Sequence, residues 1–125
     1  MVVSEGPLAE KRVLVVEDEF LVGLTLCEDL ARLAAQVTGP VASLGEALAV
    51  LQHQQFDAAL IDVNLRGEMS FPLADELLAR NVPFVFVTGY GADAIPARFR
   101  QVLRIAKPHD PKALPFLVGQ MAQSR

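Results

Sequence analysis

The sequence predicts an α/β fold with a doubly wound, five-stranded parallel sheet. Five short apolar segments alternate with helical patterns along the chain, which is the order that strand–helix–strand units produce. The third segment, 58–61, has no polar alternation, and such a run is typical of a strand covered on both faces. Right-handed crossovers then leave few strand orders. We expect helices on both faces of the sheet, in one domain over residues 1–125 with its core at about 12–123.

The first strand and helix are predicted from the pattern of their side chains. A β-branched apolar strand spans 12–16 and runs directly into three acidic residues, 17–19. A helical pattern follows over about 20–36. The side chains that we expect to pack against the sheet are Leu24, Cys27, Ala31 and Ala34.

A second strand is expected at 37–41, and a second helix after Ser43. Ser43 is a predicted N-cap, with Glu46 three residues later as its partner in a capping box. The helix should end at His53, and a cation in the last turn of a helix is ordinary complementation of the helix dipole. We therefore assign no functional role to His53.

The second half of the chain alternates in the same way. The loop 65–70 contains a glycine turn signal, a helix is expected over about 71–80, and a fourth strand over 83–88. The segment 92–101 is a weak helix because Pro96 interrupts it and few apolar residues recur in it, so the fourth helix should be short or irregular.

The chain is expected to close with a fifth strand at 102–106 and a last helix. Asp110 can cap that helix, with Pro111 at its first position. Each strand of the predicted sheet is then followed by a helical segment.

The composition excludes several functional classes. The net charge is -4 and the 11 Lys and Arg residues are scattered, so we expect no direct nucleic-acid binding. No apolar run approaches the roughly 18 residues that a membrane span requires, and no signal peptide is recognisable. The single cysteine, Cys27, excludes an intramolecular disulfide and suits a reducing compartment. We expect a cytoplasmic protein without membrane association and without a second domain.

Two aspartates flank the central strand, and the direction of the strand separates their roles. Ligands and reacting groups in a parallel sheet collect outside the carboxyl ends of the strands. Asp62 ends the strand and should face that edge, whereas Asp57 precedes the strand and should face the opposite edge. Asp62 is therefore the candidate for the chemistry.

Polar side chains end three other strands at the same edge. They are Glu17 and Asp18 after the first strand, Thr88 on the fourth and Lys107 after the fifth. Ionised carboxylates about 4 Å apart repel by roughly 4 kcal/mol at an effective dielectric near 20, so the acidic cluster requires protonation or a cation. Oxygen ligands without histidine or thiol favour Mg²⁺ or Mn²⁺. Carboxylates, a metal, a hydroxyl and a lysine at one point suit phosphoryl transfer, with an aspartate attacking phosphorus.

This arrangement resembles a response-regulator receiver domain over residues 12–118. The family's motifs occur in the family's order and at about its intervals. They are the pair Glu17-Asp18, Asp62 in Ile-Asp-Val-Asn-Leu, Thr88 in Val-Thr-Gly, and Lys107-Pro108. Within the family, the segments 62–68 and 83–91 resemble the FATGUY subgroup of single-domain receivers.

The resemblance implies a flavodoxin-like fold with strand order 2-1-3-4-5 and a histidine kinase that phosphorylates Asp62. It assigns Mg²⁺ to Glu17, Asp18, Asp62 and the backbone carbonyl of Asn64, and phosphoryl contacts to Thr88 and Lys107. Receivers commonly hold the bond before the proline of the Lys-Pro pair in cis. Subgroup members are similar to partners of HWE-type kinases, and some have a poorly formed fourth helix.

Several positions depart from the family's pattern. Val87 stands where the subgroup usually has alanine, which narrows the space beside the site. Arg104 stands three positions before Lys107, where many receivers carry a switch Tyr or Phe. The rotation of an aromatic side chain coupled to Thr88 therefore cannot be expected in this protein. Tyr90 is an alternative reporter, and we treat Tyr90 and Arg104 as a candidate switch surface. His109 replaces a common Phe and is expected to be solvated.

Four functions are compatible with parts of this pattern. We favour a phosphorylation-dependent switch that contacts an unknown downstream protein and is no enzyme beyond the Mg²⁺-dependent phosphorylation and dephosphorylation of Asp62. Sequence does not separate it from a phosphate sink that drains a kinase. An Asp-dependent phosphohydrolase of the haloacid-dehalogenase type would want a second Asp where Asn64 stands, and a cap domain. A flavodoxin-like cofactor carrier would want a phosphate loop after the first strand, which the sequence lacks.

Overall fold

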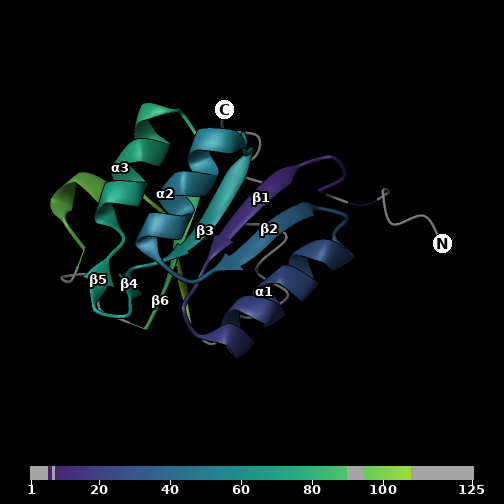
Figure 1. Cartoon of the computed structure of the whole chain (residues 1–125), viewed down its shortest axis with the longest axis horizontal. Helices are drawn as coiled ribbons and strands as arrows, with labels where there is room; N and C mark the ends of the chain where they lie inside the picture. The colour runs from purple at the N-terminus through teal and green to yellow at the C-terminus, as the bar shows by residue number, and fades with distance from the viewer. Residues whose placement is uncertain (1–5, 7, 90–94, 108–125) are drawn as a thin grey trace.

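The computed structural model describes residue 6, residues 8–89 and residues 95–107. Within these residues, parallel strands form one sheet in the order β2-β1-β3-β6-β7, which is 2-1-3-4-5 when its strands are counted along the chain. This is the predicted order, and Figure 1 shows β2, β1 and β3 side by side. The strands are β1 at Arg12–Val16, β2 at Gln36–Val41, β3 at Ala58–Asp62, β6 at Phe84–Thr88 and β7 at Arg104–Ala106.

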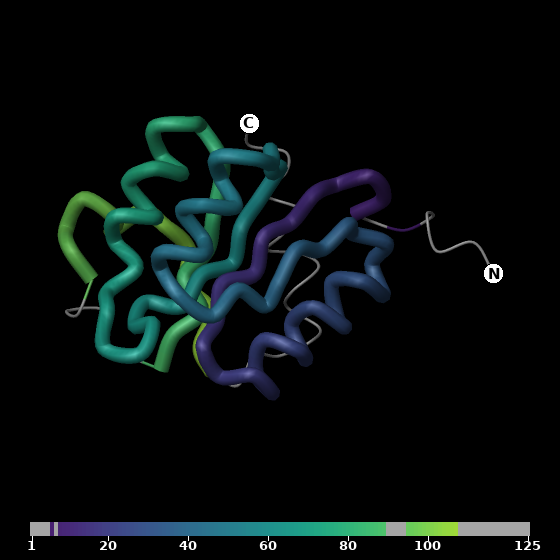
Figure 2. The backbone as a smooth tube through the Cα atoms, in the orientation of Figure 1, coloured from purple at the N-terminus to yellow at the C-terminus, as the bar shows by residue number. Residues whose placement is uncertain are grey.

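Helices cover both faces of the sheet, and the chain trace can be followed in Figures 1 and 2. Helix α1, Phe20–Arg32, packs on one face, and helices α2, Leu44–His53, and α3, Phe71–Ala79, pack on the other. Successive side chains of β1 alternate between the two apolar clusters beneath these helices, so Val13 lies with α1 and Leu14 lies with α2 and α3. Because both faces are buried at the centre of the sheet, β1, β3 and β6 are mostly apolar, as the sequence predicts, whereas the edge strand β2 also carries polar residues.

Helix α1 ends earlier than the side-chain pattern predicts. The pattern extends to Gln36, but the helix ends at Arg32, and Gln36 is the first residue of β2. Ala34 adopts a φ of 72°, and its N–H donates to Ala31 O at 2.9 Å while Ala35 N–H donates to Leu30 O at 3.2 Å. This is the Schellman termination that glycine usually marks. An alanine there gives no signal in the sequence.

The buried face of α1 also differs from the prediction. Leu26 and Leu30 are fully buried, whereas Leu24 is 36% exposed and Ala31 is exposed. Cys27, from the same predicted face, is only half-buried. The prediction is wrong for Leu24 and Ala31, whereas Ala34 is buried and Cys27 packs against the apolar cluster. This helix carries apolar residues around most of its circumference, so periodicity alone does not select one face.

Ser43 caps α2 as predicted. Its Oγ accepts a 3.2 Å hydrogen bond from the backbone N–H of Glu46, which satisfies one of the unpaired donors at the start of the helix. We expect Ser43→Ala to lower the free energy of unfolding by about 1 kcal/mol, because alanine offers no acceptor to that N–H. Urea unfolding of the two proteins measures the change. An unchanged midpoint would show that the cap contributes nothing.

The loop after β3 contains a short hairpin that the sequence pattern does not predict. Strands β4, Asn64–Leu65, and β5, Glu68–Met69, pair antiparallel. Arg66 and Gly67 connect them with φ values of 56° and 88°, and two successive left-handed residues are typical of a type I′ turn. The predicted turn at the glycine is confirmed, but the residues on either side of it are paired strands.

The described part of the crossover between β6 and β7 is short, as predicted. It contains one turn of 3-10 helix, η2, at Ala97–Phe99. Phe99 is fully buried and stacks on Phe71 with their ring centroids 5.7 Å apart, so this segment docks through an aromatic side chain that the prediction did not weigh. Strand β7 begins at Arg104, later than predicted, because the N–H of Val102 still bonds back to Phe99 O at 2.9 Å.

Several predictions fall on residues outside those that the structure describes. They concern Tyr90, the bond before Pro108, His109 and the last helix after Asp110. Over the described ranges, none of the helices has both the length and the apolar character needed to cross a membrane.

Candidate functional site

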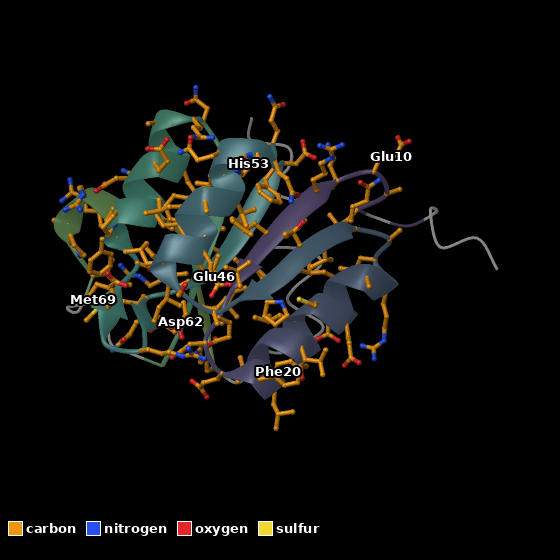
Figure 3. All side chains as sticks on the ribbon, in the orientation of Figure 1. Glu10, Phe20, Glu46, His53, Asp62 and Met69 are labelled. Carbon is orange, nitrogen blue, oxygen red and sulfur yellow. The ribbon has the colours of Figure 1, made fainter. Side chains whose placement is uncertain are left out.

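The two aspartates that flank β3 lie at opposite edges of the sheet. Asp57 Oδ2 accepts a 2.8 Å hydrogen bond from the backbone N–H of Arg12, at the start of β1. Asp62 lies at the end of β3 and is only 4% exposed. Figure 3 shows His53 in the upper part of the view and Asp62 in the lower part. The structure therefore separates the two aspartates as predicted and keeps His53 away from Asp62.

Lys107 joins the ends of β1, β3 and β7. Its Nζ lies 2.8 Å from Asp62 Oδ2, 2.8 Å from Glu17 Oε1 and 3.1 Å from Glu19 Oε1. The ammonium is mostly buried, at 16% side-chain exposure. Three residues that the sequence places at strand ends, Glu17, Asp62 and Lys107, thus meet in one ion cluster.

The acidic residues after β1 meet Asp62 as predicted, and Glu19 joins them. Glu17, Asp18, Glu19 and Asp62 each offer a carboxylate oxygen, and these oxygens lie within 4.8 Å of one another. Backbone N–H groups hold two of the carboxylates that follow β1, since Glu19 N–H donates to Glu17 Oε2 at 3.1 Å and Arg66 N–H donates to Asp18 Oδ2 at 3.0 Å. The acidic cluster is therefore oriented partly by the turn before α1 and partly by the β4–β5 hairpin.

The environment of the cluster shifts the pKa of two of its groups. Burial raises the pKa of Glu17 to about 7 from an ordinary 4.5, with Lys107 opposing the rise and Asp62 adding to it. Burial lowers the pKa of Lys107, but its hydrogen bonds to Asp62, Glu17 and Glu19 outweigh burial and hold that pKa above its ordinary range. Lys107 is therefore charged at neutral pH, and Glu17 binds a proton more readily than an exposed glutamate.

The raised pKa of Glu17 predicts that the metal-free protein loses stability as pH rises. A carboxyl whose folded-state pKa is raised contributes stability that is complete below its unfolded pKa of 4.5 and is lost as pH passes about 7. We expect the free energy of unfolding to fall by up to about 3 kcal/mol between about pH 5 and about pH 8.

Urea unfolding in the presence of a chelator measures this fall at the two pH values. The variant Glu17→Gln has no titrating carboxyl at this position and should lose most of the pH dependence. An equal fall in the variant and the wild type would assign the effect to another group.

The β4–β5 hairpin turns the backbone of Asn64 toward Asp62. Ser70 N–H donates to Val63 O at 2.8 Å, which makes Asn64 and Met69 the non-hydrogen-bonded pair of the hairpin. The peptide groups of such a residue point away from the partner strand. Asn64 N–H accordingly donates to Asp62 Oδ1 at 3.4 Å. In an extended strand residue the carbonyl and the N–H point to the same side, so we expect the carbonyl of Asn64 on the side of Asp62.

Thr88 and Arg104 occupy different places relative to this cluster. Thr88 ends β6, beside β3 in the sheet, is 4% exposed, and its carbonyl accepts a 3.3 Å hydrogen bond from Lys107 N–H. Arg104 starts β7 opposite Phe86 and is half-buried. The structure thus brings Thr88 to the edge of the sheet that carries Asp62, and it places Arg104 at the other end of its strand.

An open hollow of about 420 Å³ lies over these groups. Residues from the turn before α1, from β3, from the hairpin and from the end of β7 line it, among them Asp18, Glu19, Asp62, Asn64, Arg66 and Lys107. Sequence reasoning missed two of the contacts here. Glu19 stands in the predicted acidic run, which was a usable signal, but nothing in the sequence announced that the N–H of Arg66 would hold Asp18.

Solved structures that are similar to this one include two of SdrG and one of a kinase receiver domain. SdrG from Sphingomonas melonis Fr1 is 36% identical, with a TM-score of 0.81 over 94% of this chain and 98% of that chain. The BeF₃-activated conformation of SdrG from Pseudomonas melonis Fr1 is 39% identical, with a TM-score of 0.70 over 85% and 95%. The receiver domain of the sensor histidine kinase PA1611 from Pseudomonas aeruginosa PAO1, with a magnesium ion coordinated in its active site cleft, is 24% identical, with a TM-score of 0.79 over 92% and 99%.

The sheet order matches the flavodoxin-like fold of receiver domains. Because the identity to SdrG extends over nearly the whole of both chains, the similarity goes beyond the fold, and this chain belongs to the receiver-domain response regulators. No protein-family model and no curated protein matches the sequence.

Proposed function

We propose that this protein is a phosphoacceptor of a two-component system and that a histidine kinase phosphorylates it on Asp62. The observation that carries the proposal is the convergence of three groups on one hollow, namely the Asp62 carboxylate, the acidic cluster after β1 and the Lys107 ammonium. Membership of the receiver-domain family supports it, because receiver domains serve two-component signalling.

The proposed transfer uses side chains that the structure brings together. A carboxylate oxygen of Asp62 forms a bond to phosphorus, while the bond between phosphorus and the histidine nitrogen of the donor breaks. Lys107 pairs with Asp62 Oδ2 at 2.8 Å. After transfer its ammonium can pair with a phosphoryl oxygen instead and balance the added negative charge. Thr88, at the neighbouring strand end, is the proposed hydroxyl donor to the phosphoryl group.

The residues at the site fit Mg²⁺ or Mn²⁺. The donors are oxygens only, from the carboxylates of Glu17, Asp18 and Asp62 and from the backbone carbonyl of Asn64 on the same side. Glu17 Oε1 is buried and pairs with Lys107 Nζ at 2.8 Å, and a carboxylate oxygen has a second lone pair that a bound cation would use. When bound, the cation supplies neutralising charge to the carboxylates and to the phosphoryl oxygens.

Incubation with acetyl phosphate and Mg²⁺, followed by intact mass measurement, tests the proposal. We expect the protein to gain one phosphoryl group with Mg²⁺ present and none when a chelator removes the metal. Equal phosphorylation with the chelator would contradict the metal requirement. No gain from acetyl phosphate or from a phosphorylated histidine kinase would contradict the phosphoacceptor role itself.

We further propose that the output is a protein contact made by the candidate switch surface of Tyr90 and Arg104. Thr88 connects the site to this surface in the described structure. It ends β6, the strand beside β3, and its carbonyl accepts a backbone hydrogen bond from Lys107 N–H. Movement of Thr88 toward a phosphoryl group would therefore shift the backbone between β6 and β7. The existence of a BeF₃-activated conformation of SdrG makes the corresponding experiment practical here.

Amide NMR spectra with and without BeF₃ and Mg²⁺ separate a switch from a phosphate sink. A switch predicts shifted resonances at Arg104 and along residues 95–106, beyond the lining of the hollow. Shifts confined to the hollow, together with a short acyl-phosphate lifetime, would favour a phosphate sink instead.

The donor we propose is an HWE-type kinase in the cytoplasm. The support is the resemblance of the segments 62–68 and 83–91 to the FATGUY subgroup. In parallel transfer assays, we expect an HWE-type kinase to phosphorylate the protein faster than histidine kinases of other types do. Equal rates would remove the support for this assignment.

A further inference from the structure

Ser70 stands at the N-cap position of α3 but its side chain does not cap that helix. Its backbone carbonyl accepts a helical hydrogen bond from Ala74 N–H at 3.0 Å, while its hydroxyl makes no bond to the helix. The hydroxyl instead donates to the backbone carbonyl of Asp62 at 2.5 Å. Ser43, at the same position of α2, bonds its own helix. The hydroxyl of Ser70 therefore bonds the backbone of the proposed phosphoacceptor, Asp62, and does not cap α3.

The burial of Ser70 makes its hydrogen bond to the Asp62 carbonyl costly to lose. Ser70 is fully buried, so no water replaces the hydroxyl if it is removed, and the Asp62 carbonyl would lose a donor inside the protein. A second bond, from Ser70 N–H to Val63 O at 2.8 Å, closes the same junction. The two bonds clamp the chain at the end of β3 to the start of α3.

The two bonds join the residues that precede and follow the β4–β5 hairpin, and the hairpin itself contacts the site. The hairpin carries Asn64, whose N–H donates to Asp62 Oδ1, and Arg66, whose N–H donates to Asp18 Oδ2. Ser70 thus anchors both the backbone of Asp62 and the base of the segment that orients Asp18. Neither contact requires the Ser70 side chain to touch a phosphoryl group or a metal.

We propose that Ser70 is a positioning residue for the phosphorylation of Asp62, an inference that rests on the proposed function above. Its hydroxyl fixes the peptide that follows Asp62, and this peptide sets the direction in which the carboxylate leaves the strand. A displacement of a reacting group by about 1 Å can slow a reaction by up to about 100-fold. A buried hydrogen bond that prevents such a displacement of the Asp62 carboxylate therefore raises the rate of phosphorylation as well as stabilising the fold.

The test compares Ser70→Ala with Ser43→Ala, since each variant removes one serine hydroxyl from the start of a helix. Phosphorylation by acetyl phosphate is followed at saturating Mg²⁺, and the thermal midpoint is measured on the same samples. We expect Ser43→Ala to lower the midpoint by about 3–5 °C and to react at the wild-type rate. We expect Ser70→Ala to react about tenfold more slowly.

The ¹⁵N resonance of Val63 gives a readout that does not depend on phosphorylation. Its amide nitrogen belongs to the same peptide group as Asp62 O, so it should shift in Ser70→Ala and remain in place in Ser43→Ala. If Ser70→Ala does not fold, Ser70→Cys replaces it, because a thiol keeps the shape and donates more weakly. In that variant we expect a smaller loss of rate.

The outcomes distinguish this inference from the proposed function. A wild-type protein that accepts no phosphoryl group would overturn both. A wild type that is phosphorylated, with Ser70→Ala or Ser70→Cys reacting at the same rate, would overturn the role of Ser70 alone. A rate loss in Ser43→Ala equal to that in Ser70→Ala would assign the effect to lowered stability and would also overturn it.

Discussion

Asp62→Asn is expected to abolish phosphorylation, and Asp57→Asn is expected to leave its rate unchanged. The amide of asparagine has no anionic oxygen to attack phosphorus, so no acyl phosphate can form at position 62. Asp57 is chemically identical to Asp62, but it lies at the opposite edge of the sheet and bonds Arg12 N–H. The two variants therefore carry the same chemical change at opposite edges of the sheet.

Intact mass after incubation with Mg²⁺ and acetyl phosphate measures both variants. Asparagine at position 57 retains a carbonyl oxygen that can accept the bond from Arg12 N–H, so the control should fold. The account would be wrong if Asp62→Asn still gained a phosphoryl group, or if Asp57→Asn lost the ability to gain one while remaining folded.

Asp18→Asn is expected to weaken Mg²⁺ binding by about 100-fold or more and to slow phosphorylation in proportion at limiting metal. Groups that only orient a metal ligand are typically worth 10–100-fold in affinity, and the loss of a charged ligand should cost at least as much. Asparagine keeps an oxygen that can accept the bond from Arg66 N–H. The substitution therefore removes charge from the acidic cluster with little change in its shape.

Isothermal titration of Mg²⁺ into the wild type and the variant measures the change. Asp75→Asn is a matched control, because Asp75 is a half-exposed aspartate on α3 that pairs with Arg98 at 2.9 Å and belongs to no part of the acidic cluster. Wild-type affinity in Asp18→Asn would show that Asp18 is not a metal ligand. A loss of affinity in Asp75→Asn of equal size would show that net charge alone governs binding.

The parts of this structure that could be predicted from sequence are those set by burial. The strand ending at Asp62 is covered on both faces, and this leaves a continuous apolar run whose polar end is visible in the sequence. The ends of the other strands are marked in the same way by Glu17, Thr88 and Lys107. Because parallel strands place their carboxyl ends at one edge, the convergence of these residues follows from the strand pattern.

The parts that could not be predicted depend on backbone conformations and on choices among hydrogen-bond partners. Alanine at position 34 adopts the left-handed conformation that ends α1, although glycine is the usual signal. Ser70 has the residue type and position of a helix cap, yet its hydroxyl bonds Asp62. The contact of Lys107 with Glu19 depends on the course of the turn before α1. None of these leaves a periodic trace in the sequence.

The measurement that tests the account most directly is identification of the carboxyl group that carries the phosphoryl group. Borohydride reduction of the phosphorylated protein converts an acyl phosphate into an alcohol, and peptide mass spectrometry then locates the altered residue. We expect conversion at Asp62 and at no other carboxyl group. Conversion at Asp18, Glu19 or any other acid, with Asp62 unmodified, would contradict it.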